Sequence, residues 1–389
     1  MSELNYLEKL LDGTEVEWKA LGDVTSVLRG KRLTKNLLSA EEKFPVFHGG
    51  LEPLGYYNKS NRPANTVMII NVGASAGTVG YSTVDFWSSD GCFCLEHNEL
   101  LNNRFLYFAL IGYQSLLKSK VRVAGIPTLD AIVVNKLLIP IPCPENPEKS
   151  LAIQSEIVRI LDKFTALTAE LTAELNMRKK QYNYYRDQLL SFKDGEVEWK
   201  TLGEVAQYSK TRISFELLDE RNYVGVDNLL QNRAGKSLSN HVPTSGKLTE
   251  FIPNDILIGN IRPYLKKIWQ ADCIGGTNGD VLVIRCIDSS INTRYLYQIL
   301  ADDKFFEYNM QHAKGAKMPR GSKEDIMKYP IPVPPLTLQA RIVEILNKFD
   351  TLTNSITEGL PREIELRQKQ YEYYRDLLFS FPKPETASN

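Results

Sequence analysis

The stretch RKKQYNYYRDQLLSF at Arg178–Phe192 occurs a second time, with few changes, as RQKQYEYYRDLLFSF at Arg367–Phe381. A second pair of near-identical pieces consists of EVEWKALGDV from Glu15 and EVEWKTLGEV from Glu196. The residues between these duplicated pieces show little similarity from one copy to the other. The chain is therefore a duplicated frame that carries two different inserts, and this pattern predicts two different surfaces on one repeated scaffold.

Each duplicated stretch closes a long helical run that follows a proline-led segment, IPIP at Ile139 or IPVP at Ile331. Apolar residues recur at steps of three and four along the first run, which is the pattern of a coiled-coil seam. The offset between the two runs grows from 185 to 189, so the second run is four residues longer in its middle. There, Gly359-Leu360-Pro361 predicts a kink or a break, because proline removes a backbone donor.

The interior of the first run, LTAELTAEL from Leu167, repeats four residues twice. Consecutive steps of four are a stutter that locally unwinds a coiled coil. Since four residues of helix add about 6 Å, the length of this run is expected to set the spacing of whatever the two inserts hold.

The two inserts, residues 25–138 and 206–329, share a layout of short strands, a helix and a proline-containing loop. Pro127 and Pro319 hold the same place in this layout, at an offset of 192. The glycine-rich GASAGTVG from Gly73 predicts a hairpin turn between two strands, since it lacks the G-x-G-x-x-G spacing of a nucleotide-binding turn.

The predicted fold class is mixed α/β. Two β-rich α/β domains are joined by two long antiparallel coiled-coil helices in a pseudo-two-fold, circular repeat. The predicted boundaries are 1–145 for the first domain with its lead, 146–195 for the first helical spacer, 196–335 for the second domain, and 336–389 for the second spacer and tail. Because KDGEVEW follows the first run and LDGTEVEW begins the chain, the two termini are expected to lie close together and complete one half.

The net charge is zero, but its distribution is uneven. Residues 25–138 hold 12 Lys and Arg against 8 Asp and Glu, and residues 206–329 hold 17 against 14. The frame holds 18 against 25. This segregation favours a polyanionic partner for the inserts, with chance scatter of surface charge as the alternative.

The remaining composition argues for a cytoplasmic protein without a metal site. No apolar run reaches the roughly 18 residues of a membrane helix, and the N-terminus lacks the pattern of a signal peptide. The five cysteines match no zinc spacing, which predicts buried thiols in a reducing compartment. The four histidines, His48, His97, His241 and His312, show no metal-ligand spacing.

The sequence also lacks the usual catalytic motifs. Gly235-Lys236-Ser237 resembles the end of a phosphate-binding loop, but Leu230 stands where the first glycine is required. Pro334-Pro335 does not fit the catalytic tetrapeptide of an amino-methyltransferase. A triad assembled in space stays open, but no nucleophile–base set is evident. The chain is interpreted as a recognition and assembly subunit without an active site.

The order of these elements resembles a known family. The chain runs from an insert to an IPIP-type segment, a Q-x-x-IV-x-IL-x-KF helix and QYxYYRDxLLSF, and then repeats this order. In this respect it resembles the specificity subunit (HsdS) of type I restriction–modification systems. LTAELTAEL and EVEWK-x-LG resemble the IC subclass. The resemblance covers essentially the whole chain. It implies that the two inserts are target recognition domains, each reading half of a split, asymmetric site on double-stranded DNA.

The resemblance also implies partners and a place in bacterial defence against phage. The frame would dock two methyltransferase subunits (HsdM) and with them restriction subunits (HsdR). S-adenosylmethionine, ATP and Mg would belong to those partners, and no cofactor is expected on this chain. The alternative is a non-catalytic coiled-coil protein scaffold without DNA specificity. S-adenosylmethionine bound to the isolated chain would instead favour a free-standing enzyme.

Reading a base sequence needs side chains that reach base edges, and affinity needs cations near phosphates. Polar and basic residues in turn-rich loops are therefore candidate DNA contacts, although any one of them can be a solvated surface charge. In the first domain the candidates are Lys31, Arg32, His48, Lys59, Asn61, Arg62, Lys118, Lys120 and Arg122. In the second they are Lys210, Arg212, Asn228, Arg233, Lys236, Asn260, Arg262, Tyr264, Lys266, Lys267, Lys314, Lys317, Arg320 and Lys323, with the strongest cluster around KMPRGSK.

The duplicated Tyr-Tyr-Arg triplets exceed what a two-helix seam can bury. They are assigned to partner docking, with packing at the helix ends as the alternative. The six residues are Tyr184, Tyr185, Arg186, Tyr373, Tyr374 and Arg375.

Overall fold

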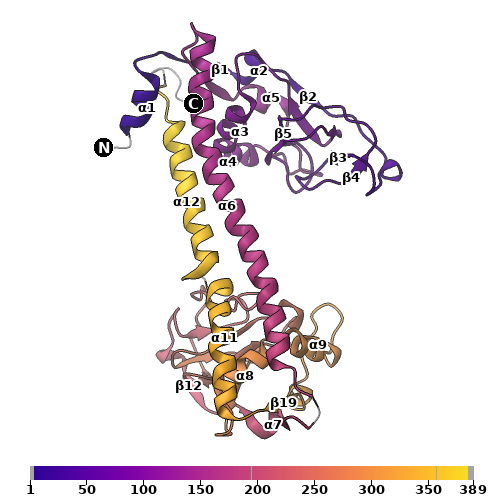
Figure 1. The fold of residues 1–389 in the computed structure, drawn as a ribbon, viewed down its shortest axis with the longest axis vertical. Helices are drawn as coiled ribbons and strands as arrows, with labels where there is room; N and C mark the ends of the chain where they lie inside the picture. The colour runs from indigo at the N-terminus through magenta and orange to yellow at the C-terminus, as the bar shows by residue number, and fades with distance from the viewer. Residues whose placement is uncertain (1–3, 194, 356, 384–389) are drawn as a thin grey trace. The chain divides into compact units, whose positions relative to one another are not determined.

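The computed structural model describes residues 4–193, 195–355 and 357–383 (Figure 1). The chain forms two compact units. Unit 1 holds the residues up to Leu167 and those from Arg367 onward, and unit 2 holds Thr168–Leu366. Each unit thus contains one insert, the first part of the helical run that follows it, and the last part of the other run. The sequence-based boundaries follow the inserts and runs, whereas the compact units divide both helical runs.

Unit 1 contains a two-stranded, a three-stranded and a four-stranded sheet. The pairs in the four-stranded sheet are antiparallel, in the order β2 (Val27–Arg29), β8 (Cys92–Leu95), β5 (Thr66–Ile70), β6 (Val79–Ser82). The three-stranded sheet has the order β4 (Gly55–Tyr57), β3 (Phe44–Phe47), β7 (Trp87–Ser88), and β1 (Val16–Ala20) pairs with β9 (Leu138–Pro142). The helices are α1 (Leu4–Leu11), α2 (Leu21–Val24), η1 (Lys35–Leu37), α3 (Asn103–Gly112), α4 (Gln114–Ser119) and α5 (Ala131–Asn135).

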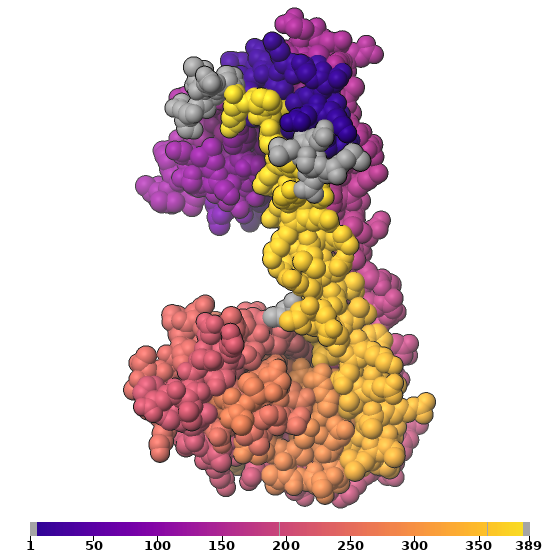
Figure 2. Space-filling model, turned by 90° about the vertical axis from the view of Figure 1, so that its left-hand side faces the viewer, coloured from indigo at the N-terminus to yellow at the C-terminus, as the bar shows by residue number. Residues whose placement is uncertain are grey.

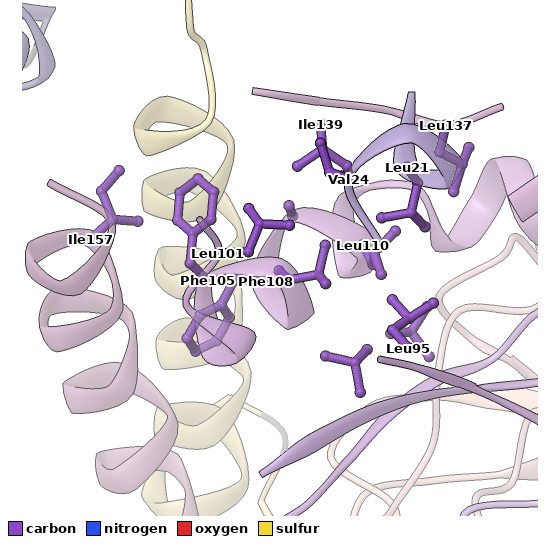
Figure 3. Close-up of a cluster of buried hydrophobic side chains, with 14 of the residues drawn as sticks. Leu21, Val24, Leu95, Leu101, Phe105, Phe108, Leu110, Leu137, Ile139 and Ile157 are labelled. Atoms are coloured by element: carbon purple, nitrogen blue, oxygen red, sulfur yellow. The ribbon is translucent and has the colours of Figure 1, made fainter. Parts of the chain in front are cut away.

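The core of unit 1 lies between the four-stranded sheet and α3. Helix α3 begins at a capped end, because the Asn102 side chain accepts hydrogen bonds from the backbone N–H groups of Arg104 and Phe105. Phe105 and Phe108 are fully buried, and Ile157 of the long helix α6 (Pro147–Leu190) belongs to the same cluster (Figure 3). The sheet, α3 and the frame helix therefore share one core.

The two ends of the described chain meet in unit 1. Trp18 of β1 donates its indole Nε1–H to the backbone oxygen of Pro382 at 2.7 Å. Leu11 of α1 and Phe381 are buried in the same cluster. In Figure 2 the indigo surface of the N-terminal residues borders the yellow surface of the C-terminal residues. The expectation that the ends complete one half together is confirmed.

Unit 2 has two four-stranded sheets and one two-stranded sheet. The first has the order β11 (Ala206–Tyr208), β18 (Val281–Cys286), β15 (Ile256–Gly259), β16 (Ile268–Gln270), and the second β12 (Arg212–Ser214), β14 (Lys247–Phe251), β17 (Gly275–Thr277), β13 (Tyr223–Val224). Strand β10 (Glu198–Thr201) pairs with β19 (Pro330–Val333). The helices are α7 (Leu202–Val205), η2 (Phe215–Leu217), η3 (Pro263–Leu265), α8 (Thr293–Leu300), α9 (Asp303–Gln311) and α10 (Lys323–Ile326).

The two units repeat one architecture in spite of their different sequences. The sheet β11-β18-β15-β16 has the strand order of β2-β8-β5-β6. Asn292 caps α8 as Asn102 caps α3, with the side chain accepting from two backbone N–H groups. Trp18 pairs with Pro140 and Trp199 pairs with Pro332 at the same register. The predicted shared layout, and the mixed α/β class with two sheet-rich domains, are confirmed.

The two helical runs differ as predicted. Helix α6 is 44 residues long and passes through LTAELTAEL without interruption. The second run is two helices, α11 (Leu336–Asn354) and α12 (Gly359–Leu378). Gly359 has φ +80°, and a Cβ on it would lie 2.4 Å from the Thr351 backbone oxygen, so only glycine fits this start. The predicted break is confirmed, and it lies just before Gly359-Leu360-Pro361, which form the start of α12; a coiled coil along the full runs stays a prediction.

The cysteines only partly match the expectation. Cys92 and Cys94 are buried, but Cys143, Cys273 and Cys286 are half-buried, because these three lie near the surface ends of strands and loops. None of the helices in the described ranges is both long and apolar enough to cross a membrane. Within the same ranges, no three His, Cys, Asp or Glu side chains gather as a metal site.

Candidate nucleic-acid interface

Unit 1 carries an exposed hairpin loop, residues 122–128, here called the first hairpin loop. Arg122 and Thr128 exchange backbone hydrogen bonds of 2.9 and 3.0 Å, which close the loop. The Pro127 oxygen accepts from the Gly73 N–H at 2.9 Å, and the Leu129 N–H donates to the Asn71 oxygen at 2.8 Å. The loop therefore lies against the turn that follows the buried strand β5.

Unit 2 builds the same feature from residues 314–320, the second hairpin loop. Lys314 and Arg320 exchange backbone hydrogen bonds of 2.9 and 2.8 Å. The Pro319 oxygen accepts from the Arg262 N–H at 2.7 Å, and the Gly321 N–H donates to the Asn260 oxygen at 3.2 Å. This loop lies against the turn after β15, the strand that corresponds to β5.

The turn beneath the first hairpin loop is the glycine-rich stretch from Gly73. The Ile70 N–H donates to the Thr78 oxygen at 2.9 Å, and Gly73 and Gly77 have φ of +87° and +86°. These are left-handed conformations that glycine adopts without strain. The prediction of a hairpin turn between two strands is confirmed, since the stretch joins β5 to β6.

Buried asparagines lie at the base of both loops. Asn71 and Asn260 are 2% and 5% exposed, and neither side-chain Oδ1 has a hydrogen-bond partner among the described residues. In unit 2, a Cβ on Gly321 would lie 2.3 Å from Oδ1 of the buried Asn309, so glycine is required there. Asn260 was predicted to contact DNA, but it is enclosed beneath the loop; Asn71 was not predicted at all.

Three basic residues flank the first hairpin loop. Lys118 and Lys120, at the end of α4, are exposed and have no ion-pair partner in the part of the chain that the structure describes. Arg122 Nη2 lies 2.9 Å from Asp130 Oδ1, and its side chain is 67% exposed. The structure thus brings these three predicted contacts together around one loop.

The other candidates of unit 1 lie around the three-stranded sheet. Lys31, Arg32 and Lys59 are exposed. Asn61 Nδ2 donates to the Ser88 oxygen at 3.0 Å, while its Oδ1 accepts from the Ser88 N–H at 2.7 Å.

Two further candidates of unit 1, Arg62 and His48, contact neighbouring residues of the same unit. Arg62 Nη1 donates to the Asn61 oxygen at 2.8 Å. His48 Nδ1 lies 3.4 Å from Asp90 Oδ1. Asn61 and Arg62 therefore shape their own loop, a role that the sequence did not reveal.

The second hairpin loop gathers the cluster around KMPRGSK. Lys314 and Lys317 are exposed without an ion-pair partner in the described ranges, and Lys323 begins α10. Arg320 Nη1 lies 2.6 Å from Asp280 Oδ1, with its side chain 53% exposed. On the adjoining turn, Arg262 and Tyr264 are also exposed.

Two more cations of unit 2 converge on one carboxylate. Lys266 Nζ lies 2.7 Å from Asp303 Oδ1, and the Arg233 guanidinium pairs with the same oxygen. These pairs fasten the loop after β13 to the turn η3. Arg233 and Lys266 were predicted to contact DNA, but in the structure they form ion pairs with Asp303 of the same unit.

The remaining candidates of unit 2 divide between inward and exposed positions. Lys267 Nζ donates to the Val226 oxygen at 2.5 Å, and burial lowers the pKa of its amine. Lys236 lies 5.1 Å from the centre of the Trp269 ring. Asn228 is 3% exposed and binds three backbone groups of its own loop. Lys210 and Arg212, near the edge strand β12, are exposed.

Apolar side chains at the loop tips were missed. Val123 and Ile126 of the first hairpin loop are 80% and 71% exposed, and Met318 of the second is 51% exposed. Exposed apolar groups between cations suit contacts with thymine methyl groups or insertion between base steps. The sequence signal for the first loop is a pair of apolar residues beside Gly125 and Pro127, directly after the basic residues Lys118, Lys120 and Arg122.

The duplicated tyrosines are exposed at Tyr184 and Tyr185 in unit 2 and at Tyr373 in unit 1. Tyr184 is 61% exposed and Tyr373 is 52% exposed. Tyr185 is 43% exposed although its ring stacks on Phe349 at 5.5 Å between ring centres, and the half-buried Tyr374 stacks on Phe164 at 5.2 Å.

The assignment of Arg186 to partner docking is wrong. Arg186 is only 2% exposed; its guanidinium lies 4.0 Å from the centre of the Tyr182 ring, and Nη2 donates to Gln298 Oε1 at 3.4 Å. Residues four apart share one helix face, so Arg186 follows the buried Tyr182 inward. Arg375 is likewise turned inward, with 16% of its side chain exposed and a 2.6 Å pair with Asp376.

Comparison with known proteins finds one family. The family model described as the type I restriction modification DNA specificity domain matches residues 14–178 and 195–366. The chain is 43% identical to the EcoR124I/EcoR124II type I restriction enzyme specificity subunit of Escherichia coli, over 100% of both chains. It is 33% identical to the EcoprrI specificity subunit of Escherichia coli, over 92% of this chain and 93% of that one.

The fold also matches a solved structure. The crystal structure of a type I restriction–modification S subunit from M. genitalium has a TM-score of 0.63 at 18% identity. The match covers 96% of this chain and 98% of that one. At this identity, the likeness supports the fold alone.

The second hairpin loop gives a prediction on salt dependence. Each phosphate contact contributes about 0.9 to the slope of log affinity against log salt concentration. Replacing both Lys317 and Arg320 with Ala is expected to weaken DNA binding and to reduce that slope by up to about 1.8 in a fluorescence-anisotropy titration. Lys348→Ala, which removes one charge at a 75% exposed lysine on α11 away from the loop, is the control and should leave the slope unchanged. An unchanged slope in the double variant would contradict the placement.

The burial of Arg186 predicts a stability effect. Arg186→Ala leaves a cavity beside Tyr182 and is expected to lower the free energy of unfolding by about 2–4 kcal/mol. Arg186→Met keeps most of the volume and should cost less than about 1.5 kcal/mol. Tyr184→Ala, at an exposed site, should change it by less than about 0.5 kcal/mol. Urea unfolding of the three variants measures these changes in the free energy of unfolding. Equally small effects for all three would contradict the burial of Arg186.

Proposed function

The chain belongs to the type I restriction–modification specificity subunits, and from this membership we propose that it reads a split, asymmetric DNA site and assembles the system's other subunits around itself. Each half of the site would be read by one unit. The two units would act together because the frame joins them through α6 and the α11–α12 run.

The observation that carries this proposal is the pair of hairpin loops. Both lie against the turn after the corresponding strand, β5 or β15, and both receive a backbone hydrogen bond from that turn. Their tips differ: the first presents Val123 and Ile126, the second Lys317 and Met318. Equivalent positions with different side chains are what two unlike half-sites require, because base edges are distinguished by the chemistry of the contacting groups.

We assign the chemistry of the system to its partners. S-adenosylmethionine, ATP and Mg²⁺ would be bound by methyltransferase and restriction subunits, and this chain would contribute recognition and positioning without a catalytic step. Two methyltransferase subunits fit the duplicated frame, since Tyr184 and Tyr373 occupy corresponding exposed positions. A cytoplasmic location and membership of the IC subclass stay predictions.

Methylome sequencing tests the function directly. A host that expresses this chain with its methyltransferase partner should acquire methylated adenines in a two-part, asymmetric motif with a fixed gap. A stable complex that adds no new methylated motif would favour the alternative of a protein scaffold without DNA specificity.

The same readout tests the spacing role of α6. Deleting Thr172–Leu175 from the uninterrupted helix removes about 6 Å and turns one end by about 40°. With about 3.4 Å per base pair, the gap should shorten by one or two base pairs while both half-sites keep their sequence. A deletion variant that methylates the original spacing would contradict this role.

A further inference from the structure

Unit 2 has an apolar pocket that the described residues of the chain leave open, here called the Trp199 pocket. Its volume is about 290 Å³, and its apolar wall comes from Leu190, Phe192, Trp199, Tyr329, Pro330 and Pro332. Trp199 is 43% exposed. Its indole N–H has no hydrogen-bond partner within residues 4–193, 195–355 and 357–383. An indole ring that is exposed beside an open apolar pocket forgoes the stabilisation that burying its large apolar surface would give.

The corresponding indole of unit 1 is covered. Trp18 occupies the same place on β1 as Trp199 on β10, since each pairs with the first proline of its IPIP or IPVP segment, Pro140 or Pro332. There the chain's own C-terminal segment passes over the ring. The Pro382 oxygen accepts the indole hydrogen bond at 2.7 Å, and Lys383 Nζ lies 5.2 Å from the ring centre.

The connectivity explains why no described segment covers Trp199 in the same way. The covering residues of unit 1 directly follow the duplicated phenylalanine Phe381. After the matching Phe192, the chain instead turns into the strand that carries Trp199 itself. Lys193 and Glu196 close this turn, with the Glu196 N–H donating to the Lys193 oxygen at 3.1 Å. The residues that cover the indole in one unit are therefore used as a connection in the other.

The charges at the rim of the Trp199 pocket favour a basic occupant. Asp302 and Lys304 both line the pocket, and Lys304 is paired with Asp187 at 2.5 Å. Burial raises the pKa of the Tyr329 phenol, and the carboxylates of Asp302 and Glu307 raise it further. Because Asp187 pairs with Lys304, the Asp302 carboxylate is available to attract a lysine placed as Lys383 is over Trp18.

We propose that the Trp199 pocket binds an extended Phe-Pro-Lys-type segment of a partner polypeptide. The residue corresponding to Pro382 would accept the Trp199 indole hydrogen bond, and the following cation would lie over the ring. Proline-containing segments suit aromatic grooves because they lose little conformational entropy on binding. The unit 1 contact between Trp18 and residues 382–383 is the internal example of this recognition. The inference concerns the frame and is independent of DNA reading.

A peptide titration tests the proposal. The probe is the synthetic peptide FSFPKP, the sequence of residues 379–384, added to the full chain up to millimolar concentration in an isothermal titration. The full chain is expected to bind one peptide and Trp199→Leu none. A chain ending at Phe381 uncovers Trp18 and should bind two, and Trp199→Leu in that shorter chain should restore one.

Conservative changes separate recognition from folding. Trp199→Phe keeps an aromatic ring but removes the donor, so it should weaken binding by about two- to tenfold with an unchanged thermal unfolding curve. Replacing the first proline of the peptide, which corresponds to Pro382, with alanine should weaken binding at least as much. The same is expected when the peptide lysine is replaced with glutamate.

Three results would overturn the proposal. One is peptide binding that Trp199→Leu leaves unchanged. Another is the absence of binding to the full chain at millimolar peptide. The third is dimerisation of the full chain that is lost on ending it at Phe381, since this would assign the pocket to the tail of a second copy. None of these measurements involves DNA. A result that overturns the peptide-binding proposal would therefore leave the proposed recognition of DNA unaffected.

Discussion

Each unit of this chain completes its hydrophobic core with the end of a helix that begins in the other unit's part of the sequence. In unit 1, Tyr371, Leu378 and Phe381 join the core built by the first insert. In unit 2, Tyr182 is buried in the core built by the second insert, and Phe192 packs against it. This is why the YxYYRDxLLSF stretch is duplicated so closely: its apolar side chains meet the same kind of pocket twice. The inserts can differ in sequence because the frame supplies the same contacts to each.

Much of this arrangement could be predicted from the sequence, because duplication and periodicity are local in the chain. The offset change predicted the irregular second run, and Gly359-Leu360-Pro361 predicted the break between α11 and α12. The joining of the ends followed from the order of repeated pieces. These features depend on backbone chemistry or on identical residues in the two copies. Neither requires knowledge of contacts between residues far apart in the sequence.

The candidate site was harder to predict, because the role of a polar side chain depends on partners far away in the chain. Arg186 looked like a surface residue, yet it lies on the face of α6 that packs on Gln298. Arg233 and Lys266 meet at Asp303, and Asn228 closes its own loop. Conversely, the exposure of Val123 and Ile126 contradicts the general burial of apolar residues and became visible only once the hairpin loop was placed. The exposed cations of both hairpin loops remain the strongest candidates for DNA contacts.

The central claim is that two equivalent hairpin loops with different tips read the two halves of one DNA site. The most direct measurement transfers the tip of the first loop, residues 123–126, into positions 315–318 of the second loop. The methylated motif is then determined in a host that also expresses the methyltransferase partner. We expect one half of the motif to change or lose its sequence preference, while the other half and the gap stay the same. A motif that is unchanged in both halves, or altered in both, would contradict it.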